Sequence, residues 1–168
     1  MPLIPFSSLP SSARLWIFAA EKPIDPSKLP MFNQELDTFL DVWQAHGKAL
    51  AAGHELRYGQ FLFVAVDENL ELPSGCSIDT LTREVTRIGK EFGVDFLSSA
   101  LISYREGKEI ITLDRPAFKS LVESGKVTSE AIVFNNTLTA ITDVREGKWE
   151  VPAYESWHGR AFKFPVTA

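Results

Sequence analysis

The sequence predicts an α+β domain with a mixed, mostly antiparallel sheet and helices packed on one face of that sheet. Three observations lead to this class. Apolar or alternating runs flank short glycine turns, as in β-hairpins. Two longer segments repeat apolar residues every three or four positions, as in helices that bury one face. Helices also alternate with strands along the chain. At 168 residues, with 45% apolar and 23% charged residues, the chain has the composition of a soluble globular domain.

The first half of the chain predicts a strand, a helix, a hairpin and a second helix. The first helix is expected to run until Gly53, and the hairpin turns at Gly59. The second helix is expected to start with Ser77 or Cys76 near its N-cap and to stop at Gly93. In order, we expect these elements at residues 14–20, 32–52, 55–66 and 77–92.

The second half predicts a hairpin, a short helix and further short strands. The hairpin runs from Phe96 to Leu113 and turns at Glu106-Gly107, and Pro116 opens the helix that Gly125 ends. Short strands are expected at residues 131–134, 138–144 and 149–151. No linker divides the chain, so we expect a single domain over residues 1–168, with residues 1–12 and 163–168 as extended or loosely held tails.

Charge and composition exclude several classes of partner. The net charge is −5 and the basic residues are scattered, which argues against a nucleic-acid surface. No apolar run approaches the ~20 residues that span a bilayer, and the N-terminus lacks a signal peptide, so we expect no membrane insertion and a cytoplasmic location. The lone Cys76 agrees with this compartment, because secreted domains usually carry paired cysteines.

Common catalytic and cofactor motifs are absent. The chain has no Walker A phosphate loop, no G-x-G-x-x-G turn, no G-x-S-x-G elbow and no H-E-x-x-H helix. A single cysteine excludes the standard structural zinc patterns. We therefore predict no cofactor, no metal site and no ATP binding.

Three residues are candidates for catalysis: Cys76, His46 and His158. A thiol near the first turn of a helix ionises more easily, and a histidine beside it could act as its base. The alternative for Cys76 is a small buried hydrophobic residue in a glycine turn. The alternative for His46 is an interfacial histidine at the edge of the first helix, and for His158 a place in a C-terminal segment anchored by aromatic rings.

Other polar residues near predicted element ends are candidates for ligand binding. Asp79 is expected in the first helical turn, where it would cap free N–H groups. Asn135 follows a strand, where asparagine more often forms an Asx turn than it binds a ligand. The segment around His158 combines aromatic and polar groups, as pocket linings often do. The candidate ligand-binding residues are Ser77, Asp79, Asn135, Asn136, Ser156 and Trp157.

Several segments together resemble an uncharacterised bacterial family whose members often carry the label "ABC transporter ATPase". The likeness covers the chain from roughly Ile4 to Phe162, and it implies no catalytic role for any residue. The label itself does not fit, because the phosphate loop and the signature motif of an ABC ATPase are both absent. The resemblance is carried by Trp43-x-x-His46-Gly47, Ser74 to Asp79, Val133 to Asn136, Trp149 to Ala153 and Glu155 to His158.

Three classes of function follow. The favoured one is a binding or interaction module with a small polar pocket near Cys76 and His158, because it requires no assembled catalytic set. The alternative is a small cysteine-dependent hydrolase or transferase that uses Cys76 with His46 or His158 as base. The third is an accessory subunit of an assembly. The sequence names neither the small molecule or protein that is bound nor the oligomeric state.

Overall fold

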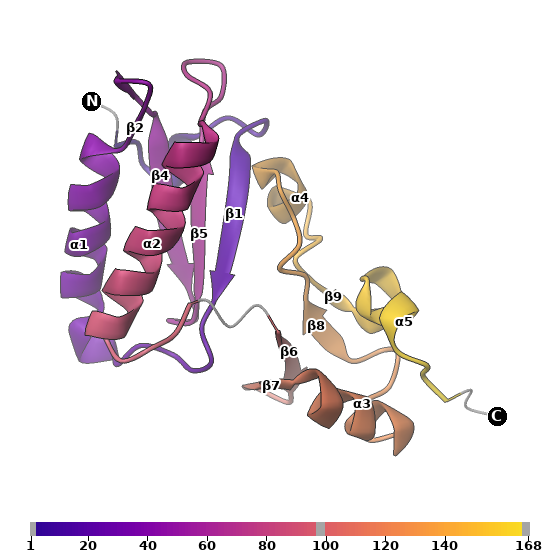
Figure 1. Ribbon diagram of the computed structural model, residues 1–168. Helices are drawn as coiled ribbons and strands as arrows, with labels where there is room; N and C mark the ends of the chain where they lie inside the picture. Colours follow the sequence, from indigo (N-terminus) through magenta and orange to yellow (C-terminus); the bar gives the residue numbers. More distant parts are fainter. Residues whose placement is uncertain (1–2, 97–99, 166–168) are drawn as a thin grey trace. The chain divides into compact units, whose positions relative to one another are not determined.

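The computed structural model describes residues 3–96 and 100–165, and the chain divides into two compact units (Figure 1). Unit 1 comprises residues 1–99 and 138–145, and unit 2 comprises residues 100–137 and 146–168. Helices combine with sheets whose strands all pair antiparallel, so the predicted α+β class is confirmed. The described strands form three separate sheets, however, where the sequence analysis expected one.

A three-stranded sheet forms the centre of unit 1. Its strands are β1 (Arg14–Ala19), β4 (Ala52–Arg57) and β5 (Phe61–Val66), in the order β1-β5-β4. Every residue of β5 is buried, as expected of a continuous apolar run in the middle of a sheet. The predicted hairpin between β4 and β5 is confirmed, with a turn in which Gly59 has a φ of 65°.

Two helices cover one face of this sheet, α1 (Leu29–Val42) and α2 (Gly75–Glu91) (Figure 1). Their apolar faces join alternate residues of β5 in one core. Burial of this surface supplies most of the stability of such a layer, at roughly 25 cal/mol per Å² of apolar area. The members that are fully shielded from solvent include Phe32, Leu36, Leu40, Leu62, Val64, Leu81 and Ile88.

The N-terminal segment covers the opposite face of the sheet. The Ile4 amide donates to the Ala52 carbonyl at 2.8 Å, and the Phe6 ring packs 6.2 Å from that of Phe63. A Cβ on Gly53 would lie 2.3 Å from the Ile4 carbonyl oxygen, so only glycine permits this approach. Leu9 is buried as well, so the described part of the predicted arm is held against the sheet.

The first helix ends ten residues earlier than predicted, and that prediction was wrong for residues 43–52. Trp43 leaves the helix and a short hairpin follows, β2 (Gln44–Ala45) and β3 (Lys48–Ala49). His46 and Gly47 form its turn with φ values of 51° and 77°, which a helix does not allow. Trp43 and Leu50 remain in the core, so apolar spacing alone suggested a helix that the turn prevents.

The segment predicted as a strand at residues 138–144 instead forms a short helix, α4 (Ile141–Arg145), which belongs to unit 1. Ile141 and Val144 are both buried at helical spacing. The Ile141 amide donates to the Ala13 carbonyl at 3.1 Å, and Arg145 donates to the Leu9 carbonyl at 2.7 Å. The chain therefore returns to the N-terminal segment here.

Unit 2 contains a four-stranded antiparallel sheet in the order β7-β6-β8-β9. The predicted hairpin becomes β6 (Leu101–Glu106) and β7 (Glu109–Asp114), with Gly107 at a φ of 62°. The remaining elements are β8 (Ile132–Phe134), β9 (Glu150–Pro152), α3 (Arg115–Glu123) and α5 (His158–Ala161). Their core includes Tyr104, Phe118 and Phe162. Phe164 packs against the same cluster, so the described end of the chain is attached to unit 2.

Short 3-10 turns connect several of these elements, at Phe6–Ser8, Pro26–Lys28 and Ala153–Glu155. Across residues 3–96 and 100–165, the helices are all too short or too polar to cross a bilayer.

Candidate functional site

Cys76 lies at the second residue of α2 and is exposed, which confirms the predicted position near a helix N-terminus. The alternative of a buried core residue is wrong, because Cys76 is exposed although its neighbour Ser77 is buried. The N-cap is Ser74, not Ser77 or Cys76 as predicted. The amide of Ser77 donates to Ser74 Oγ at 3.1 Å, and the amide of Ser74 donates to Ser77 Oγ at 2.7 Å. This reciprocal cap satisfies the N–H groups of Ser74 and Ser77 at the start of the helix.

Ser77 and Asp79 therefore contribute differently from what the sequence suggested. Ser77 is buried, and its hydroxyl donates to the Ser74 carbonyl at 2.8 Å besides accepting in the cap. Asp79 is exposed and lies beyond the first turn, so the prediction that it caps the helix was wrong. The capping acceptor is instead the hydroxyl of Ser74, which accepts from the Ser77 amide.

His46 is exposed in the β2–β3 turn and not at a helix edge, which corrects its predicted setting. Among the residues that the structure describes, no hydrogen bond joins His46 to Cys76. A thiolate that depends on a neighbouring base needs contact at about 3 Å. The described contacts of unit 1 thus leave the thiol without an assembled base.

His158 is the first residue of α5 in unit 2 and is only 1% exposed. Its Nδ1 lies 2.8 Å from Ser156 Oγ, and its ring stacks on Trp157 with centroids 3.9 Å apart. Burial, with the positive charge of Arg115 as a second cause, lowers the pKa of His158 from 6.5 to about 4. The imidazole is therefore neutral at pH 7.

The aromatic C-terminal segment packs onto unit 2, as its composition predicted. Trp149 and Phe162 are buried, whereas Tyr154 is an exception at 60% exposed. A Cβ on Gly159 would lie 2.7 Å from the Ala153 carbonyl oxygen, so glycine lets α5 approach the preceding turn.

Asn135 and Asn136 both have partners inside unit 2. Asn135 Oδ1 accepts from the Thr137 amide at 3.2 Å, which confirms the Asx turn that the sequence favoured. Asn136 Oδ1 accepts from Trp149 Nε1 at 2.9 Å. These amides hold the chain between β8 and β9.

A groove of about 700 Å³ lies against α3 and the C-terminal segment, and sequence analysis missed it. Arg115, the first residue of α3, stands over two aromatic rings, 5.4 Å from the Trp157 centroid and 5.1 Å from that of Phe162. The lining combines charged and apolar side chains: Arg115, Pro116, Lys119, Val122, Glu123, Ala161, Phe162 and Lys163. We call it the Arg115 groove.

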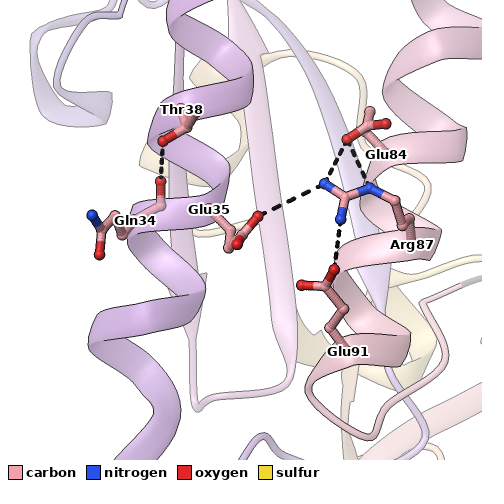
Figure 2. Close-up of polar contacts among 6 residues, drawn as sticks. All are labelled: Gln34, Glu35, Thr38, Glu84, Arg87 and Glu91. Atoms are coloured by element: carbon pink, nitrogen blue, oxygen red, sulfur yellow. Dashed lines mark hydrogen bonds and ion pairs between the residues drawn. The ribbon is translucent and has the colours of Figure 1, made fainter.

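A second groove, of about 470 Å³, lies at the surface of α1 and the end of α2. Figure 2 shows Arg87 of α2 with carboxylates around it, and two of them, Glu35 and Glu91, also line the groove. Arg87 contacts Glu84 at 2.8 Å, Glu91 at 2.7 Å and Glu35 of α1 at 3.7 Å. The hydrogen bond to Glu84 raises the pKa of Arg87 above its usual value. Each of the three guanidinium nitrogens of Arg87 donates to a carboxylate of the protein.

His54 is a further polar residue that sequence analysis did not single out, and its side chain is only 10% exposed. Its Nε2 lies 2.6 Å from Asp37 Oδ1, whereas its Nδ1 is buried and has no hydrogen-bond partner among the described residues. Because solvent does not reach Nδ1, this nitrogen is closed to a ligand in the observed conformation. His54 therefore links β4 to α1 and offers no open site.

Comparison of the sequence with protein-family models and curated proteins, and of the structure with solved structures, finds no match. The function must therefore be argued from the geometry of the two units. A sequence signal for the Arg115 groove existed only in part: Asp114-Arg115-Pro116 is a typical helix start. The two rings under Arg115 lie more than forty positions further along the chain, beyond the reach of local patterns.

Proposed function

We propose that this protein is a cytoplasmic, non-enzymatic binding module whose ligand site is the Arg115 groove of unit 2. The observation that carries the proposal is Arg115 itself. It is held on two aromatic rings at the wall of a groove large enough for a small molecule, and it has no carboxylate partner among the described residues. Concave sites with apolar walls and a few charged groups are the usual form of ligand pockets.

Binding is better supported than catalysis because the candidate catalytic groups are engaged elsewhere or isolated. His158 is neutral, and its Nδ1 is committed to Ser156. Cys76 is exposed, and no base is hydrogen-bonded to it among the residues of unit 1 that the structure describes. Ser156 and Trp157 act here as supports for the groove, since they fix the ring of His158 and the position of Arg115.

A fragment screen by NMR on the ¹⁵N-labelled full chain tests the proposal. We expect a subset of fragments to shift the amide signals of Val122, Ala161 and Phe162, and to do so equally in Cys76→Ser. Binding that is confined to residues around Cys76, or lost in Cys76→Ser, would contradict the assignment of the site.

The alternative function, thiol chemistry at Cys76, is favoured by one observation, which is the exposure of the thiol in the first turn of a seventeen-residue helix. Its direct test is the rate of reaction with a disulfide reagent against pH. An activated thiol reacts fast well below the ordinary pKa of about 8.5. A thiol that reacts only slowly at neutral pH would count against this alternative.

The sequence also bears on nucleotide hydrolysis. Because the chain lacks a phosphate loop, we propose that it does not hydrolyse ATP. Release of phosphate from Mg·ATP by the purified protein, abolished by a groove variant, would contradict this.

A further inference from the structure

We propose that the Arg115 groove binds a small organic anion, with its acid group on Arg115 and its apolar body along the groove wall. The inference rests on the proposed function and adds the chemical class of the ligand. Carboxylates and phosphates attached to an apolar body share this chemistry.

Two aromatic rings hold the side chain of Arg115. A guanidinium over an aromatic ring is attracted by the negative face of the ring, and stacking leaves the N–H donors at its edge free to point outward. Arg115 Cζ lies 5.4 Å from the ring centroid of Trp157 and 5.1 Å from that of Phe162, within the range of a cation–π contact. The side chain is therefore already ordered before a ligand arrives, which lowers the entropy lost on binding.

Arg115 has no carboxylate partner among the described residues. The arginines of the two sheets each face a carboxylate, as Arg57 does with Glu55 and Arg105 does with Glu150. In residues 3–96 and 100–165, no carboxylate lies within ion-pair distance of Arg115. Five N–H donors of fixed geometry without an acceptor suit a bidentate anion.

The side chains that line the groove carry a net positive charge. The groove carries Arg115, Lys119 and Lys163 against the single carboxylate of Glu123. Lys119 lies 3.7 Å from Glu123, with both side chains more than half exposed. The groove is thus locally positive although the whole chain has a net charge of −5. A local excess of one sign in a concave surface attracts ligands of the other sign.

The Arg115 groove also has an apolar wall. Pro116, Val122, Ala161 and Phe162 line the same groove, so the site is not a purely ionic surface. An inorganic anion would leave this wall unused, whereas an anion with a hydrocarbon or aromatic body covers it.

The test compares matched probes on the ¹⁵N-labelled full chain by NMR titration. Benzoate and benzyl alcohol have the same ring and differ in charge, while phenyl phosphate and inorganic phosphate separate the acid from the body. We expect benzoate and phenyl phosphate to shift the groove signals at millimolar concentrations or below, with weaker binding at high salt. We expect benzyl alcohol and inorganic phosphate to bind at least about tenfold more weakly.

Substitutions test whether benzoate binding depends on Arg115. Arg115→Gln should weaken benzoate binding about tenfold, and Arg115→Lys should restore part of it. Arg160→Gln removes an exposed arginine of unit 2 outside the groove lining and is the matched control, with no effect expected. The amide spectrum of each variant shows whether unit 2 remains folded.

Two results overturn the inference. If benzyl alcohol binds the groove as tightly as benzoate and Arg115→Gln changes neither, the ligand is not an anion, although a binding site is still present. If benzoate and phenyl phosphate leave the groove signals unmoved, the anion assignment is wrong, and the fragment screen decides separately whether the groove binds anything.

Discussion

Two helical arginines of this protein, Arg87 in unit 1 and Arg115 in unit 2, have opposite surroundings. Arg87 has three carboxylates, from Glu35, Glu84 and Glu91, and links α1 to α2 (Figure 2). Arg115 has two aromatic rings and no carboxylate among the described residues. Arg115 itself lines a groove, whereas beside Arg87 it is the carboxylates of Glu35 and Glu91 that line one. An external anion would therefore meet a positive side chain at Arg115 and negative side chains near Arg87.

The difference shows that a groove and a basic residue do not by themselves make an anion site. Around Arg87 the protein supplies more negative charge than the arginine carries, so an added anion would be repelled. The guanidinium of Arg115 is held in place by aromatic rings, and no carboxylate of the described residues neutralises it. This is the arrangement of a preorganised recognition site. Substitutions in the two regions should therefore differ in their cost.

Removing the aromatic support should have the largest effect. Phe162 is buried, packs 5.0 Å from Phe118 and lies under Arg115, so Phe162→Ala should lower the free energy of unfolding of unit 2 by about 3–5 kcal/mol. Urea denaturation followed by the signals of unit 2 measures it. Phe164→Ala, at a partly buried position of the same cluster, is the control with a smaller loss. Equal stability of Phe162→Ala and wild type would mean that Phe162 is not a core ring.

Acidification should destabilise unit 2 through His158. Its folded pKa of about 4 lies below the ordinary value of 6.5, so between these values the unfolded chain binds a proton that the folded chain does not. Stability is therefore complete above pH 6.5 and falls as the pH drops towards 4. The full difference is about 3 kcal/mol.

The measurement is the urea midpoint at several pH values for wild type, His158→Gln and Arg115→Gln. His158→Gln should lose this part of the pH dependence, and Arg115→Gln should reduce it because one cause of the lowered pKa is gone. Identical pH profiles for wild type and His158→Gln would show that the imidazole is not buried in its neutral form.

Neutralising each arginine in turn compares the two regions directly. Arg87→Gln leaves three carboxylates close together and should cost about 1 kcal/mol at low salt, with a smaller loss at high salt. Arg115→Gln should cost no more than about 0.5–1 kcal/mol, the scale of an exposed cation–π contact. Chemical denaturation at two salt concentrations measures both. A salt-dependent loss for Arg115→Gln larger than that for Arg87→Gln would reverse the comparison.

The smallest effect is expected outside both regions. Cys76 is exposed, and the cap beside it is formed by Ser74 and Ser77, so Cys76→Ser should change stability by less than about 0.5 kcal/mol. Ser74→Ala is the contrasting variant, with an expected loss of about 1 kcal/mol because the N-cap acceptor is removed. Thermal melting of both variants decides it, and a larger loss for Cys76→Ser would mean that the thiol has a packing role.

The sequence by itself determined the local elements whose signals are periodic and bounded. The apolar spacing from Ile78 to Phe92 predicted α2, and glycine turns predicted the β4–β5 and β6–β7 hairpins, because these structures depend on neighbours a few residues apart. The sequence also placed Cys76 at a helix start and His158 in an aromatic, packed segment.

Only the tertiary structure decided where the chain departs from its local pattern and which distant residues meet. The apolar spacing around Trp43 and Leu50 is satisfied by a hairpin instead of a helix, because the core accepts the same side chains from either backbone. The segment at Ile141 forms a helix because the N-terminal segment supplies hydrogen-bond partners for its amides. Arg115 reaches Trp157 and Phe162 across more than forty residues, and such long-range packing has no periodic trace in the sequence.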